Sequence, residues 1–184
     1  MKELIDETIL KIGLENNKGE NLSLKLNIDN PWKDADGKEY SNEFIKNEII
    51  EYVELGGKIY VGTDSMLFPD KCNFAAVIAF HDRDLNIARY YYKKIKSKSL
   101  SYRELQTKIL EEVSLAIKVA QFVLNVCPKA DVELHIDIGT NKKINATAKF
   151  FKMIHGWVTG TGFDLKVKPN SWASSLADSH TKRK

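Results

Sequence analysis

The spacing of apolar residues along this chain changes repeatedly between the period of a helix and the period of a strand. A helix begins at Ser41 and ends at Gly56-Gly57, and apolar runs separated by short turns then predict three consecutive strands. The full set expected after this helix is strands 58–64, 72–80 and 86–96, a helix 101–124, a strand 131–138, a helix 144–158, a strand 163–167 and a helical stretch from Ser171.

This βββαβαβα order predicts an α/β fold with a mixed five-stranded sheet flanked by helices. Short turns favour antiparallel pairing of the first three strands, and crossover helices favour parallel pairing of the later ones. We expect one domain over residues 41–184. Residues 1–40 form an N-terminal extension of unclear role, with helical spacing in 1–14 and strand-like alternation in 22–28.

Composition and charge narrow the class of protein. The 184 residues are 43% apolar, which suffices for one sizeable core. No apolar run is long enough for a membrane span, and the acidic N-terminus does not resemble a signal peptide, so we expect a cytoplasmic protein. Cys72 and Cys127 lack CxxC spacing and are interpreted as reduced core residues.

The charge is unevenly distributed. Residues 1–60 hold 8 Lys and Arg against 13 Asp and Glu, whereas residues 142–184 hold 9 against 2. A basic C-terminal quarter suits a polyanionic partner such as nucleic acid. A solvated basic surface explains the charge equally well.

Acidic residues supply the candidate chemistry. Asp64 and Asp137 each end a short hydrophobic run and are flanked by small residues, so two strand ends can share one metal site. Glu104 lies near the start of the long helix and Asp178 near the end of the chain. Magnesium prefers hard oxygen ligands, and a pair of ions suits phosphoryl displacement. The pattern therefore indicates a site for Mg²⁺ or Mn²⁺.

The order of elements and acids resembles the ribonuclease H-like superfamily. Within it, three stretches are similar to the YkuK-like family, a bacterial group of predicted ribonuclease H-related nucleases: Val61–Ser65, His135–Gly139 and Lys168–Asp178. The resemblance covers about residues 41–182. It implies a two-metal nuclease in which Asp64 bridges both ions, Asp137 and Glu104 complete one site, and Asp178 binds the other.

Each of these acids also has a simpler interpretation. Asp64 can start a turn toward Pro69, and Asp178 can be a surface acid. Glu104 fits a capping box with Ser101, while Glu112 falls nearer the edge of the apolar stripe of the long helix. His135 is interpreted as a hydrogen-bonded neighbour of Asp137 more than as a ligand.

Basic residues provide candidate substrate contacts. Lys142, Lys143, Lys166 and Lys168 are placed to contact phosphates. The run Arg89–Lys96 mixes aromatic and basic residues as single-strand binders do, although lysines on an edge strand also prevent aggregation. His180 can assist proton transfer or belong to a solvated tail.

The function expected is a divalent-metal-dependent nuclease acting on RNA, DNA or a hybrid. The alternative is a nucleic-acid- or protein-binding module that retains the fold without turnover. The stretch Asp137-Ile138-Gly139-Thr140 also matches a phosphate loop of actin-like kinases, but the 44 residues after Thr140 are too few for their second lobe.

Overall fold

Three long antiparallel strands form the centre of the sheet. The computed structural model describes residues 30–98, 100–141 and 146–182. Strands β3 (Ile59–Leu67), β4 (Cys72–Asp82) and β5 (Ile87–Ser97) are consecutive and pair antiparallel. Short turns connect these strands. In the turn between β3 and β4, the amide of Phe68 donates to the carbonyl of Lys71. In the turn between β4 and β5, the Asp82 carboxylate accepts hydrogen bonds from two backbone amides. The expected meander is confirmed.

The later strands pair parallel, as expected for crossover connections. Strand β6 (Val132–Ile136) pairs parallel with β3, and β7 (Asp164–Lys166) pairs parallel with β6. The first crossover consists of the short helix η1 (Leu100–Arg103) and α3 (Leu105–Val126), and the second of η2 (Ala146–Phe150) and α4 (Phe151–Gly160). The α/β class and the βββαβαβα order are therefore confirmed.

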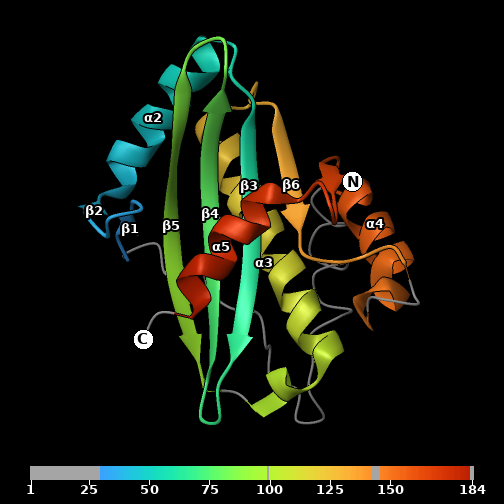
Figure 1. Cartoon of the computed structure of the whole chain (residues 1–184). Coiled ribbons are helices and arrows are strands. Elements are labelled where there is room, and N and C mark those ends of the chain that lie inside the picture. The colour runs from blue at the N-terminus through green and yellow to red at the C-terminus, as the bar shows by residue number, and fades with distance from the viewer. Residues whose placement is uncertain (1–29, 99, 142–145, 183–184) are drawn as a thin grey trace.

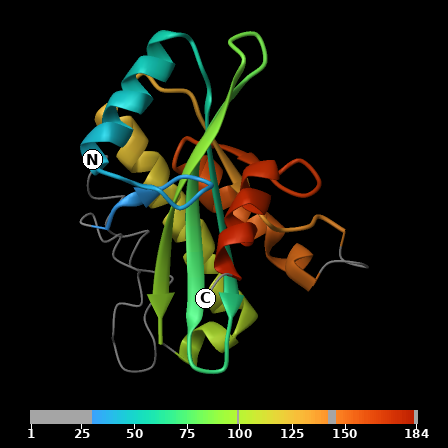
Figure 2. The ribbon, with the colours of Figure 1, turned by 60° about the vertical axis from the view of Figure 1, so that its left-hand side comes forward.

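Helices cover both faces of this sheet. The helices α2 (Asn42–Glu54) and α3 pack on one face, where Ile45, Ile49 and Val113 join the main core. The last helix, α5 (Trp172–Thr181), crosses the other face diagonally over β3, β4 and β5 (Figures 1 and 2). Strand β4 is consequently apolar and buried on both faces along most of its length.

The described part of the N-terminal extension widens the sheet. Strands β1 (Trp32–Lys33) and β2 (Glu39–Tyr40) pair with each other, and β1 pairs with β5 at Tyr92. The sheet thus has seven described strands in the order β2-β1-β5-β4-β3-β6-β7. The domain boundary at residue 41 stays a prediction, and the elements expected within 1–28 lie outside the described residues.

Two smaller expectations concern the interior and the membrane. Cys72 and Cys127 are buried and form no disulfide, as expected of core residues. None of the helices in the described part of the chain combines the length and the apolar character that a bilayer span requires.

Gly62 allows α5 to approach the sheet closely. The backbone of Ala173, at the start of α5, lies against Gly62 so tightly that a Cβ atom on Gly62 would overlap the Ala173 carbonyl group. Both partners are backbone atoms, so neither can turn away. The position of α5 over β3 therefore depends on the absence of a side chain at residue 62.

We expect Gly62→Ala to destabilise the protein by about 1 to 3 kcal/mol, the usual effect of overpacking. The measurement is chemical unfolding followed by circular dichroism. Gly156→Ala is the matched control, because a Cβ there meets no atom within 4 Å and alanine favours the helix interior. Equal stability of the two variants would contradict the close contact at Gly62.

Candidate functional site

The parallel pairing of β3 with β6 brings Asp64 and Asp137 to the same end of the two strands. The parallel pairs run from Ile59 opposite Val132 to Thr63 opposite Ile136, so Asp64 follows the last paired residue of β3 and Asp137 follows the last residue of β6. Neighbouring strands lie about 4.8 Å apart. Asp64 and Asp137 therefore lie at the same end of the paired strands, and the charge of Asp137 acts on the Asp64 carboxyl.

Asp64 lies inside its strand and not at its end. Pairing with β4 continues as far as Leu67 opposite Cys72, whereas β6 stops at Ile136. The expectation that Asp64 ends its strand, or starts a turn, is wrong, because the hairpin to β4 turns only after Leu67. Strand β6 ends opposite Thr63, one residue before Asp64. From Asp64 onward, the edge of β3 that faces β6 therefore has no paired strand among the described residues.

Two further carboxylates, carried by helices, act on Asp64. Asp178 lies on α5, and Glu112 lies on α3. The charges of Glu112, Asp178 and Asp137 all act on the Asp64 carboxyl. Four acids from four different elements therefore share one electrostatic environment.

Hydrogen bonds between α3 and β3 hold Glu112 in place. The hydroxyl of Ser65 donates to Oε1 of Glu112 at 2.5 Å, and the hydroxyl of Thr63 donates to the Glu112 backbone carbonyl at 2.9 Å. Lys108, one turn earlier, donates to the same carboxylate at 3.1 Å. Glu112 is 3% exposed, so a buried acid is fixed by three partners.

Glu104 lies apart from this group. It is exposed at the N-cap of α3, and its side chain makes no capping hydrogen bond, so the capping box with Ser101 is absent. Glu104 precedes Glu112 by about 12 Å along the helix axis. Of the two glutamates, Glu112 is the one whose charge acts on Asp64. The feature of the sequence that pointed to Glu112 was its position near the edge of the apolar stripe of the long helix.

Of the four carboxyl groups, that of Asp64 has the fewest hydrogen bonds and ion pairs to balance its negative charge. Asp64 is 8% exposed, and no hydrogen bond or ion pair reaches its carboxylate from the described residues. Burial and the charge of Glu112, with smaller contributions from Asp178 and Asp137, raise its pKa from 3.8 to about 8. Burial also raises the pKa of Glu112, against the opposing effect of Lys108.

A lysine pairs with each of the other three acids. Lys108 lies 3.1 Å from Glu112, Lys168 lies 2.9 Å from Asp137, and Lys182 pairs with Asp178. These are Nζ-to-carboxylate distances. In the metal-free protein, the three lysines thus pair with the outer acids, and Asp64 forms no ion pair within the described residues, although the charge of Lys108 lowers its pKa in part.

The donor set fits a hard divalent cation. All four groups offer carboxylate oxygens, which Mg²⁺ and Mn²⁺ prefer, and their combined charge exceeds that of the nearby lysines. As placed, the described residues include no group of three or more His, Cys, Asp or Glu side chains arranged to hold an ion. Asp137 and Asp178 would have to turn from their lysines toward Asp64 to complete such a group.

His135 positions α5 and is not available as a ligand. Its Nδ1 accepts the Ala173 amide at 3.0 Å, and its Nε2 bonds Glu133 at 2.9 Å. The ring is completely buried, and burial lowers its pKa below the usual value. His135 therefore acts as a neutral acceptor at the start of the helix that carries Asp178.

The remaining predicted residues occupy different places. Lys168 contacts Asp137, while Lys166 is exposed with its Nζ 4.0 Å from Glu133. Lys142 and Lys143 lie outside the described residues. His180 is 3% exposed and stacks on Tyr92 with ring centroids 3.5 Å apart, so it belongs to the packing of α5 and not to a solvated tail.

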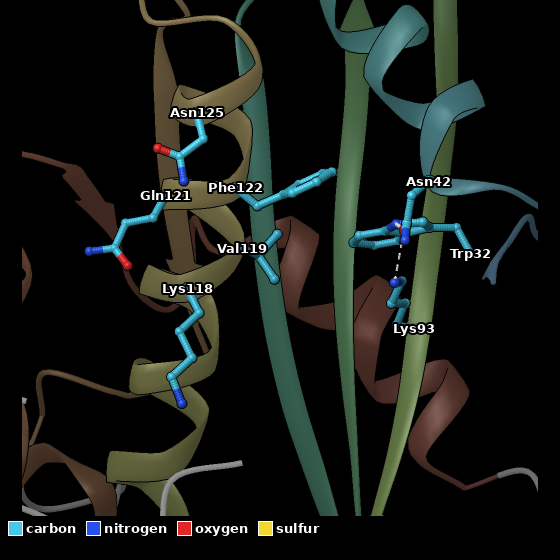
Figure 3. A pocket seen from close by; sticks show the side chains of 8 residues that line it. All are labelled: Trp32, Asn42, Lys93, Lys118, Val119, Gln121, Phe122 and Asn125. Carbon is cyan, nitrogen blue, oxygen red and sulfur yellow. Dashed lines mark hydrogen bonds between the residues drawn. The ribbon is translucent and has the colours of Figure 1, made fainter. Parts of the chain in front are cut away.

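A cavity of about 280 Å³ lies on the opposite face of the sheet, between α3 and the β1–β5 edge (Figure 3). There the ammonium of Lys93 lies 4.9 Å from the Trp32 ring centroid and donates to the Asn42 side chain at 3.1 Å. Val119 and Phe122 of α3 complete the apolar wall. None of the four acids lines this cavity, so the cavity is separate from the carboxylate site.

Comparison with known proteins identifies one family. A family model described as ribonuclease H-like matches residues 40–182, which include all four acids. No curated protein matches the sequence.

We expect Asp64→Asn to stabilise the metal-free protein, and the stabilisation to grow as the pH rises from about 4 to about 8. Because the pKa of Asp64 is raised from 3.8 to about 8, the folded state binds more protons than the unfolded state in this range, and Asp64 costs stability as the pH rises. The gain at pH 8 should reach at least about 1 kcal/mol, the equivalent of one pKa unit.

Urea unfolding in EDTA at pH 5 and pH 8 measures this difference. Glu104→Gln is the control, since this exposed side chain should leave the pH dependence unchanged. A wild-type protein and an Asp64→Asn variant with the same pH dependence would show that Asp64 ionises normally.

Proposed function

The chain belongs to the ribonuclease H-like family, and on this premise we propose that it is a divalent-metal-dependent nuclease that hydrolyses phosphodiester bonds in RNA, DNA or an RNA/DNA hybrid. The observation that carries the proposal is the Asp64 carboxyl, which is buried beside three other acids and has no cationic partner among the described residues. Such a group is costly unless a bound cation compensates it.

The proposed metal ligands are Asp64, Asp137, Asp178 and Glu112. Bound Mg²⁺ or Mn²⁺ ions would stabilise the attacking and leaving oxygens of an in-line displacement. Asp64 would be the central ligand of such a site. Glu112 takes the place that the family resemblance gave to Glu104, because Glu112 is the glutamate of α3 that acts on Asp64.

The surrounding residues would keep these acids in position. Ser65 and Lys108 hold the Glu112 carboxylate, and His135 holds the start of α5. Lys168 and Lys182, which pair with acids in the metal-free protein, would become available to substrate phosphates once cations bind. Lys142, Lys143 and Lys166 remain proposed phosphate contacts.

We expect Asp64→Asn, Asp137→Asn and Glu112→Gln each to lower cleavage at least about 100-fold, the scale on which loss of a charge-stabilising group acts. The cleavage rate of Glu104→Gln should stay within a few-fold of the wild-type rate. The assay is cleavage of labelled RNA, DNA and hybrid oligonucleotides in Mg²⁺ or Mn²⁺, with circular dichroism to confirm folding. Loss of activity in Glu104→Gln together with an active Glu112→Gln would reverse the assignment.

Cation binding provides a test that does not depend on turnover. At about 100 times its dissociation constant, a ligand that binds only the folded state stabilises it by about 2.7 kcal/mol. We expect Mg²⁺ or Mn²⁺ to raise the Tm of the wild-type protein and of Glu104→Gln, and to leave Asp64→Asn unchanged. A wild-type Tm insensitive to both ions would refute the metal site.

One observation favours the alternative, a nucleic-acid- or protein-binding module without turnover. Three of the four acids already pair with lysines, and the described residues present no ready-made group of metal ligands. Such a module would bind nucleic acid with a steep salt dependence and be indifferent to metal. Binding without any metal effect, in the assays above, would support this alternative.

A further inference from the structure

The indole of Trp172 is an exposed aromatic surface at the start of α5. Trp172 is the first residue of this helix and is 38% exposed. The helix begins over β3 and β6 and crosses the sheet toward β5 (Figure 1). Asp178 follows on the same helix six residues later, about 9 Å along its axis. The indole therefore belongs to the element that brings Asp178 to the other acids.

Three rings of the sheet support this indole. Tyr60 of β3, His81 of β4 and His135 of β6 have ring centroids 4.9, 5.7 and 5.3 Å from that of Trp172. The interplanar angles are 58°, 58° and 85°, so none of these rings lies flat on the indole. His135 also accepts the amide of Ala173, the next residue. Trp172 is thus held in position while more than a third of it stays accessible.

Two lysines connect the surroundings of this indole with those of the acids. Lys166 pairs with His135 in the parallel register of β6 and β7, and the ring of His135 contacts Trp172. Lys168, two residues later, has its Nζ 2.9 Å from Asp137. Both lysine side chains are about half exposed. A nucleic-acid strand bound at the acids can therefore contact lysines on its way to Trp172.

The charges next to the indole nearly cancel. Lys58 forms ion pairs with three carboxylates, those of Asp131, Glu133 and Asp164. The Nζ of Lys166 lies 4.0 Å from the same Glu133. A surface of balanced charge favours an uncharged planar group over a phosphate. Nucleobases are such groups, and every base has a π face that can stack on an aromatic ring.

The aromatic residues of β5 offer no comparable surface. Tyr92 is 9% exposed, and the ring of His180 stacks on it with the centroids 3.5 Å apart. Tyr91 is 6% exposed, and its hydroxyl donates to Glu48. The interpretation of the run Arg89–Lys96 as a base-stacking platform therefore does not hold for these two rings. The start of α5 offers the accessible ring that this run lacks.

We propose that Trp172 stacks on a nucleobase of a single strand whose scissile phosphate lies at the carboxylate site. The bases of a duplex are paired and stacked on one another, so the contact requires an unpaired base. Stacking uses only the π face, so recognition at Trp172 tolerates any base. This inference rests on the proposed function, because the carboxylate site sets where the strand is cut.

The test measures binding separately from cleavage. Full-length Asp64→Asn protein, with and without Trp172→Leu, is titrated with a fluorescent single-stranded oligonucleotide and with the corresponding duplex. Leucine keeps an apolar side chain at this position and removes the π face. We expect Trp172→Leu to weaken single-strand binding at least about 5-fold, the scale of one stacked base, and to change duplex binding by less than about 2-fold. Trp172→Phe, which keeps an aromatic face, should retain most of the affinity.

The matched control is Trp157→Leu, the same substitution on α4, where the indole packs against the main core. Equal losses of affinity in Trp172→Leu and Trp157→Leu would overturn the proposal, because loss of any tryptophan would then explain them. A loss in Trp172→Leu that is equally large with an abasic oligonucleotide would also overturn it, since stacking requires a base. Circular dichroism confirms that the variants remain folded.

Fluorescence reports the same contact in a protein that keeps its tryptophan. The emission of Trp172 is the difference between Asp64→Asn protein and the same protein with Trp172→Phe. We expect a single strand to quench this emission and an abasic strand to leave it largely unchanged. Emission that depends on protein concentration alone would place a second copy of the chain on the indole and would contradict the proposal.

Two further outcomes separate this inference from the proposed function. If the wild-type protein cleaves nucleic acid but single-strand affinity does not depend on Trp172, only the inference fails. If no cleavage is found but single-strand affinity depends on Trp172 and on the presence of bases, the stacking contact stands and the nuclease proposal fails.

Discussion

The burial of one carboxylate beside three others is the constraint on which this site depends. Asp64 follows the last pair between β3 and β6, and the charges of Asp137, of Glu112 on α3 and of Asp178 on α5 act on its carboxyl. Like charges repel strongly where water is excluded, and this repulsion adds to burial in raising the pKa of Asp64 to about 8. A structure that holds four acids in this way is poised to gain stability from a divalent cation.

The packing around one strand maintains this arrangement. On one face of β3, Gly62 lets the backbone of Ala173 approach, and His135 accepts the amide of the same residue. On the other face, the Thr63 hydroxyl bonds the Glu112 carbonyl and ties α3 to the strand. Neighbouring residues of β3 thus set the position of both helices that carry acids, and the site is coupled to the core.

Lysines lie close to these acids. Lys108, Lys168 and Lys182 each form an ion pair with one carboxylate in the metal-free protein. These three lysines reduce the net negative charge of the site, and a bound cation would compete with them for the same carboxylates.

The sequence by itself determined the order of elements and the mixed sheet, because hydrophobic period and connection length are local properties. The tertiary structure alone decided between Glu104 and Glu112. That choice depends on where α3 lies along β3 and on how the helix is rotated about its axis. The packing of its apolar stripe and the hydrogen bonds from Thr63 and Ser65 determine both. The tertiary structure also decided whether the Tyr92 ring can stack on a nucleic-acid base. It cannot, because α5 folds over Tyr92 and the ring of His180 stacks on it.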